Sequence, residues 1–185
     1  MKRTWIVAAC AALASCGGSQ GTDAVLRSYD LGVEAPRAQL PALKAVTMRA
    51  ALPFDGSDMH YRLAWRDPAE IAAFAQSRWA APPAELLRRQ LVRALPAAAA
   101  APCALEIELQ EFSQVFTTRD ASEARIELRA ALAAKSGRIA ARGVRVAEAG
   151  AGPNAAAGAA AFARAADRVV AELSTWIAAQ PACRP

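Results

Sequence analysis

Residues 105–148 give the clearest indication of the architecture, and their sequence is LEIELQEFSQVFTTRDASEARIELRAALAAKSGRIAARGVRVAE. Apolar residues at odd positions from Leu105 to Leu109 alternate with glutamates, which is the pattern of a strand with one face in a core. The next large apolar residues, Phe112 and Phe116, lie at even positions. Because side chains on a strand alternate between faces, this change of phase near Gln110 predicts a β-bulge or a strong bend.

The same stretch continues into two further strands. Residues 126–132 place apolar side chains at even positions, and residues 138–148 form the next strand. Its apolar residues also change phase, at Gly143, which predicts a second bulge there. The pair Ser136-Gly137 between the strands is typical of a tight turn. Three consecutive strands joined in this way form an antiparallel meander.

Shorter strands are expected before the meander. Residues 44–52 and 59–65 both alternate between apolar and polar side chains, and the turn-forming residues 53–58 lie between them. Two strands joined by a turn are therefore predicted here. Residues 27–33 could form a further short strand.

Helices are expected at three places. The sequence Asp67-Pro68-Ala69-Glu70 has the capping pattern of a helix start and predicts a short helix through Gln76. Residues 82–95 begin at a Pro-Pro pair and carry leucines on one face and arginines on the other. Residues 153–180 carry large apolar side chains at helical spacing: Phe162, Val169, Leu173 and Trp176. The sequence thus predicts an α+β domain over residues 28–183, with a largely antiparallel sheet of about five strands and two to three helices on one face.

Composition limits the classes of function. The chain has 185 residues, a net charge of +5 and 55% hydrophobic residues, of which 51 are Ala. No run of 18 apolar residues is present, so no membrane-spanning helix is expected. With one His, no Gly-rich phosphate loop and no metal-ligand spacing, we expect no enzyme, no metal and no cofactor. His60 is expected on a polar surface, and the carboxylates of Glu106, Glu108 and Glu127 are expected to face solvent or a cross-strand arginine such as Arg125 or Arg129.

The N-terminus indicates export. Lys2 and Arg3 precede an apolar run over residues 5–13, which predicts a secretory signal peptide. The following Leu13-Ala14-Ser15-Cys16 resembles a bacterial lipobox, in which the cysteine thiol carries a diacylglycerol. We therefore expect a lipoprotein signal peptide over residues 1–15 and an acylated tether over residues 16–27, with palmitate or a similar acyl chain on Cys16. The alternative is an ordinary signal peptide with a chance cysteine near its end.

The predicted acylation of Cys16 also predicts where the protein is located. Two or more acyl chains anchor a protein stably without a membrane-spanning helix. Gly17 follows the acylated cysteine, and in bacteria similar to the enteric ones this favours the outer membrane over the inner. We expect a lipid-anchored domain that faces the periplasm from the outer membrane, and export excludes nucleic acid as a partner.

Two cysteines remain in the mature domain. In an oxidising compartment, Cys103 and Cys183 are expected to form a disulfide that closes a loop of about 80 residues. The alternative is two unpaired thiols. Three tryptophans, Trp65, Trp79 and Trp176, either anchor the core or line a groove for lipid, and core positions are the commoner role.

Several segments together resemble a known family. They are residues 29–32 (YDLG), 59–62 (MHYR), 71–74 (IAAF), 78–82 (RWAAP), 85–87 (ELL), 103–105 (CAL) and 111–116 (EFSQVF), with Leu91 and Leu95 between residues 87 and 103. Their order and spacing, together with the lipobox, resemble the ABC-type transport auxiliary lipoprotein family over Ser28 to Cys183. His60 departs from the family pattern.

The resemblance implies partners rather than chemistry. Such lipoproteins accompany an ABC transporter permease and ATPase and a periplasmic protein of the mammalian-cell-entry (MCE) type, which together move lipids between the two membranes. It implies a non-enzymatic subunit that docks the MCE-domain protein at the outer membrane, possible self-assembly into a ring, and no catalytic residues. The alternatives are a lipoprotein that itself binds lipid or lipopolysaccharide, and a scaffold for envelope assembly.

Overall fold

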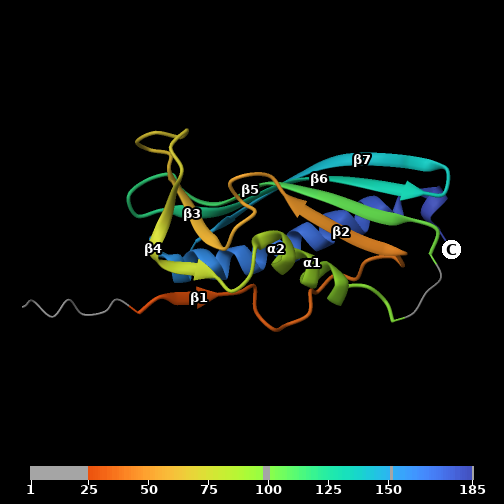
Figure 1. Cartoon of the computed structure of the whole chain (residues 1–185), viewed down its shortest axis with the longest axis horizontal. Helices are drawn as coiled ribbons and strands as arrows, with labels where there is room; N and C mark the ends of the chain where they lie inside the picture. The colour runs from red at the N-terminus through yellow and green to blue at the C-terminus, as the bar shows by residue number, and fades with distance from the viewer. Residues whose placement is uncertain (1–24, 98–100, 151, 185) are drawn as a thin grey trace, which may run out of the picture.

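The computed structural model describes residues 25–97, 101–150 and 152–184. Figure 1 shows one twisted sheet that arches over two helices, which both lie on the same face. The strands are β1 (Arg27–Tyr29), β2 (Ala45–Ala50), β3 (Asp58–Leu63), β4 (Ala72–Trp79), β5 (Ala104–Phe116), β6 (Ser122–Ala134) and β7 (Gly137–Ala149). The helices are α1 (Pro83–Arg93) and α2 (Ala155–Ala178), and a short 3-10 helix, Pro181–Cys183, follows.

The α+β class and the helices on one face agree with the prediction, but the sheet does not. It has seven strands in the order β1-β4-β3-β5-β6-β7, and β2 also pairs with β5. The pairs β1–β4, β2–β5 and β3–β5 are parallel, whereas β3–β4, β5–β6 and β6–β7 are antiparallel. The sheet is therefore mixed, and the prediction of about five largely antiparallel strands is wrong.

The parallel pairs arise because β2 and β3 do not pair with each other. Strand β2 runs beside residues 104–109 of β5, and β3 runs in the same direction beside residues 113–116. The turn-forming residues between them carry the chain forward along one edge of β5 instead of reversing it. A local turn signal shows that the chain bends, but the choice of partner strand depends on long-range pairing.

The bulge in β5 is confirmed. The register with β6 shifts between Leu109 and Glu111. As a result, Leu109 and Phe112 are both buried on the face that meets the helices, although three positions separate them. The shift also falls between the part of β5 that pairs with β2 and the part that pairs with β3.

The second bulge lies at a different residue from the one predicted. The register between β6 and β7 shifts between Leu132 and Ala133, opposite Ile139, whereas Gly143 pairs regularly with Arg129. Ala141 is exposed, so the even positions face the core from Ala140 onward. The prediction took Ala141 as a core-facing position, but alanine is tolerated on both the core face and the solvent face of a strand. The alternation pattern at Ala141 was therefore misleading.

The predicted helix over residues 67–76 is wrong. Asp67 does cap a turn, since its Oδ1 accepts a hydrogen bond from the backbone N–H of Ala69 at 2.9 Å. The chain then enters β4, which pairs with β3 and β1. Phe74 of β4 packs against Tyr61 of β3 with ring centroids 4.7 Å apart. Residues 72–79 therefore form a strand because β4 pairs with a neighbour on both of its edges. The capping residue Asp67 begins only a single turn and not a helix.

Both remaining helices agree with the sequence pattern. In α1, Leu87 and Leu91 are buried, and hydrogen bonds from Arg88 and Arg89 lower the pKa of Glu85 to about 2. In α2, the predicted apolar residues are buried against the sheet. Asn154 caps this helix, because its side chain accepts a hydrogen bond from Ala157 N–H at 2.9 Å.

A buried polar contact joins β5 to the first turns of α2. Gln114 Nε2 donates to Ser122 Oγ at 2.8 Å and to the carbonyl of Asn154 at 3.4 Å. The Gln114 side chain lies directly against Gly158 of the helix, and a Cβ at Gly158 would overlap its Oε1 and lie 2.7 Å from its Cδ. Glycine is therefore required here for close approach between helix and sheet.

We expect Gly158→Ala to lower the free energy of unfolding by about 1–2 kcal/mol, because overpacking outweighs the helix preference for alanine. The matched control is Gly143→Ala, where a Cβ meets nothing within 4 Å and the stability should not fall. In a Gln114→Ala background, Gly158→Ala should instead stabilise. Urea unfolding of the four variants measures this, and equal effects of Gly158→Ala in both backgrounds would contradict the account.

Candidate functional site

A disulfide bond links the two ends of the domain's C-terminal half. Cys103 precedes β5 and Cys183 lies in the short 3-10 helix after α2, with an S–S distance of 2.04 Å and a Cα–Cα distance of 5.3 Å. Both residues are buried. The bond fastens the end of α2 to the beginning of the central strand.

An aromatic cluster fills the space between sheet and helix. Trp79, Phe112 and Phe162 pack with ring centroids 5.3, 5.2 and 4.2 Å apart, and Phe112 stacks on Phe162. Trp79 is 1% exposed and Trp176 is 8% exposed. Trp176 lies 14 residues after Phe162 on α2, which places it about 21 Å further along the helix. Both tryptophans are therefore core residues, in separate parts of the core.

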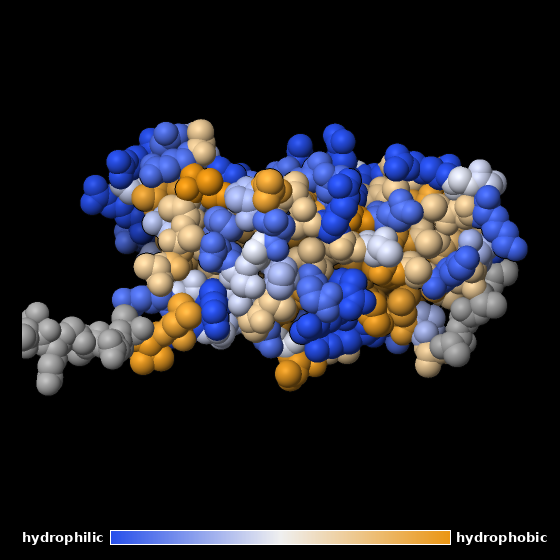
Figure 2. Space-filling view, in the orientation of Figure 1, coloured by the Kyte–Doolittle hydropathy of each residue, from blue (hydrophilic) through white to orange (hydrophobic). Residues whose placement is uncertain are grey.

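Trp65 has a different environment. It lies on the loop between β3 and β4 and is 43% exposed. The guanidinium carbon of Arg119, on the loop between β5 and β6, lies 5.2 Å from the centroid of its ring. Hydrophilic residues surround these loops at the upper left of Figure 2. The structure does not bring the three tryptophans together, so they line no common groove.

Sheet pairing brings His60 and Ser113 side by side. They are register partners in β3 and β5, and neither His60 Nδ1 nor Ser113 Oγ has a hydrogen-bond partner in the described structure. His60 is less exposed than the predicted surface position implies, because it is half-buried and its ring packs edge-on against Phe54 at 5.4 Å. Burial lowers the pKa of His60 from 6.5, although Asp58 and Glu111 act in the opposite direction. Ser113 is fully buried.

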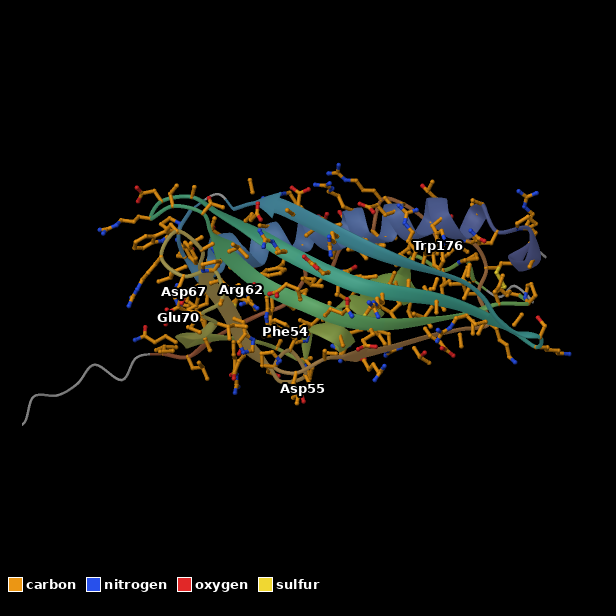
Figure 3. All side chains as sticks on the ribbon, turned by 90° about the horizontal axis from the view of Figure 1, so that it is seen from above. Phe54, Asp55, Arg62, Asp67, Glu70 and Trp176 are labelled. Atoms are coloured by element: carbon orange, nitrogen blue, oxygen red, sulfur yellow. A yellow bond between two sulfur atoms is a disulfide. The ribbon has the colours of Figure 1, made fainter. Side chains whose placement is uncertain are left out.

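One ion pair is mostly buried. Arg62 Nη2 lies 3.0 Å from Glu111 Oε2, and Arg62 Nη1 donates to the carbonyl of Ala69 at 3.3 Å. Figure 3 shows Arg62 beside Asp67 and Glu70 at one end of the molecule. Sequence reasoning missed this pair, because Arg62 and Glu111 meet only through the parallel pairing of β3 with β5.

The sheet face away from the helices carries further charge pairs. Arg49 lies 2.6 Å from Glu108, and Arg145 lies 3.1 Å from Glu127. Cross-strand pairing was predicted for these carboxylates, but the partners come from β2 and β7, whereas Arg125 pairs with Glu123 of its own strand. Each such exposed pair contributes at most about 1 kcal/mol.

A shallow groove of about 660 Å³ lies among these charges and opens to solvent. Ala131, Ala141 and Gly143 line the groove, and the small size of these residues leaves room for it. Arg49 and Arg129 also line the groove. Binding sites for small ligands enclose most of the ligand surface. This open shape suits contact with another macromolecule better than enclosure of a small ligand.

Other kinds of site can be assessed only within the described residues. There, no group of three or more His, Cys, Asp or Glu side chains could hold a metal ion. No helix in the same part of the chain combines the length and apolar character that crossing a membrane requires. Cys16, the predicted signal peptide and most of the predicted tether lie outside the described residues.

Two solved structures are similar to this chain over most of its length. It is similar to the crystal structure of protein XCC0632 from Xanthomonas campestris, described by the family model DUF330, with 26% identity and a TM-score of 0.65. That match covers 82% of this chain and 91% of the other. A second crystal structure, of an uncharacterized protein, matches with 12% identity and a TM-score of 0.64 over 83% of this chain and 99% of the other, and it shows the fold alone. Neither a protein-family model nor a curated protein matches the chain.

Removing the disulfide with Cys103→Ala and Cys183→Ala should lower the free energy of unfolding by about 2–4 kcal/mol, because the loop it closes is long. Urea unfolding measures the change. Reduction of the unchanged protein should produce a similar loss, and the double variant should not respond to reductant. A stability that is insensitive to reductant in both proteins would contradict the prediction.

Stability should decrease as the pH falls below 6.5. The lowered pKa of His60 means that the folded state binds fewer protons than the unfolded state between pH 6.5 and the folded pKa. Above this window the ring is neutral in both states and contributes no pH dependence. His60 is the only histidine in the chain, so His60→Gln should remove this slope from a series of urea unfolding curves. An unchanged slope in the variant would show that His60 is not responsible.

Proposed function

We propose that this protein is a non-enzymatic, lipid-anchored subunit of an intermembrane transport system that contains an ABC transporter and an MCE-type protein. In this role it docks the periplasmic component at the outer membrane. The main support for this proposal is the segment Leu13-Ala14-Ser15-Cys16, followed by a single domain whose motifs occur in the order typical of ABC-type transport auxiliary lipoproteins.

The structure supports a docking role through the features of its surface. The uncovered sheet face is open and bears charged side chains from β2, β5, β6 and β7, and charges on such a face steer and select a partner of complementary charge. Similarity to XCC0632 extends over most of both chains, which is consistent with one self-contained domain behind a tether.

The alternative of a lipid-carrying module is less well supported. It needs a groove lined by aromatic side chains, whereas Trp79 and Trp176 are buried in the core and Trp65 lies on a loop. A scaffold for envelope assembly differs from the main proposal only in its partners, and the experiment below distinguishes the two.

Chemical crosslinking in intact cells, followed by purification of the tagged protein, should recover an MCE-domain protein or an ABC transporter component. Deletion of the gene should increase the permeability of the envelope, because transport between the membranes is lost. Recovery of outer-membrane proteins alone would support the scaffold instead. Repeated failure to recover an MCE-domain protein or an ABC transporter component would contradict the proposal.

The control for anchoring is Cys16→Ala, which should abolish incorporation of labelled palmitate because the acceptor thiol is gone. A second control replaces residues 1–16 with an ordinary cleavable signal peptide and should release the domain in soluble form. Palmitate labelling of Cys16→Ala at the level of the unchanged protein would show that Cys16 is not the acylated residue.

A further inference from the structure

Three exposed large apolar side chains lie at one end of the long axis, on two separate segments. Among the described residues six large apolar side chains are exposed, and three of them are Val25 at 80%, Leu26 at 47% and Trp65 at 43%. Val25 and Leu26 directly precede β1, where the described chain begins, and Figure 2 shows apolar surface at that point. The β3–β4 loop that carries Trp65 lies at the same end of the long axis in Figures 1 and 3. We call Val25, Leu26, Trp65, Arg66 and Arg119 the tether end.

Trp65 is held on the outside of the molecule. Arg119 lies over its ring, and a cation in this position attracts the electron-rich face of an indole. Trp79 and Trp176 are buried, so Trp65 is the one tryptophan of the described residues that solvent reaches to a large extent. An amphipathic indole held in this way suits the boundary between lipid headgroups and water.

The length of the tether limits how far this end can lie from a bilayer. This step rests on the proposed acylation of Cys16. Nine Cα–Cα steps separate Cys16 from Val25, and a fully extended chain of that length spans at most about 32 Å. The opposite end of the long axis carries the disulfide and the C-terminus (Figures 1 and 3), so the tether end is the end kept near the membrane.

The charges at this end decide what kind of lipid surface fits. Arg66 and Arg119 are accompanied on the two loops by Asp67, Glu70 and Asp120. The loops therefore carry no net positive charge, and attraction to anionic lipid is not the main contribution. Contact depends instead on the indole of Trp65, with Val25 and Leu26 exposed at the same end of the long axis.

We propose that the tether end is a membrane-contacting surface that rests on zwitterionic lipid headgroups, with Trp65 at the headgroup level. The contact turns the long axis of the domain away from the bilayer. It leaves the open groove on the uncovered sheet face, with Arg49 and Arg129 beside it, accessible to a periplasmic partner.

Fluorescence quenching tests the contact. The full acylated protein is reconstituted into phosphatidylcholine vesicles with or without brominated acyl chains, which quench nearby tryptophans. The Trp65 component is obtained as the difference between the unchanged protein and Trp65→Phe. We expect brominated lipid to remove most of the Trp65 component and to leave the emission of Trp65→Phe unchanged.

A matched control places an exposed tryptophan elsewhere. Leu52 is 81% exposed on the loop between β2 and β3, where Figure 3 shows Phe54 and Asp55 near the middle of the long axis. Leu52→Trp in the Trp65→Phe background should not be quenched. Equal quenching at the two positions, or none at Trp65, would overturn the proposed contact while anchoring stands. Failure of the unchanged protein to float with vesicles would overturn both the anchoring and the contact.

Discussion

Strand β5 has hydrogen-bonded partners along both edges, and the extra residue near Gln110 makes this arrangement possible. On one edge β6 follows it throughout, and on the other β2 and β3 follow one after the other. The register shift lets the strand bend and still direct Leu109, Phe112 and Gln114 toward the helices. Phe112 then stacks on Phe162, and Gln114 fits against Gly158. Without the shift, one half of β5 would turn its core residues to solvent.

The two faces of this sheet have different roles. The face toward α1 and α2 holds the aromatic cluster and gives the domain its stability, since each aromatic ring buries about 150–250 Å². The opposite face is crossed by exposed ion pairs, which add little stability. Charged groups of this kind instead set the specificity and rate of association with a partner. The uncovered face is therefore where we expect a protein partner to bind.

The two ends of the long axis also differ. One end carries the beginning of the described chain, the exposed Trp65 and its Arg119 neighbour, whereas the other carries the disulfide between Cys103 and Cys183. The disulfide restrains the end opposite the proposed anchor, where β5 begins and the described chain ends. In the proposed role, a domain anchored at one end presents its far end to another protein.

Sequence alone determined the features that rest on local periodicity. The strands of the meander, the bulge near Gln110, the apolar face of α2 and the leucines of α1 could all be predicted, because each depends on neighbouring residues. Tertiary structure alone decided the parallel pairing of β2 and β3 with β5, and the pairing of Arg62 with Glu111. It likewise decided that β4 forms over residues 72–79, where a helix was predicted over residues 67–76. It also decided the burial of His60 and the exposure of Trp65. These features depend on which distant segment occupies each edge of β5, and no local pattern encodes that choice.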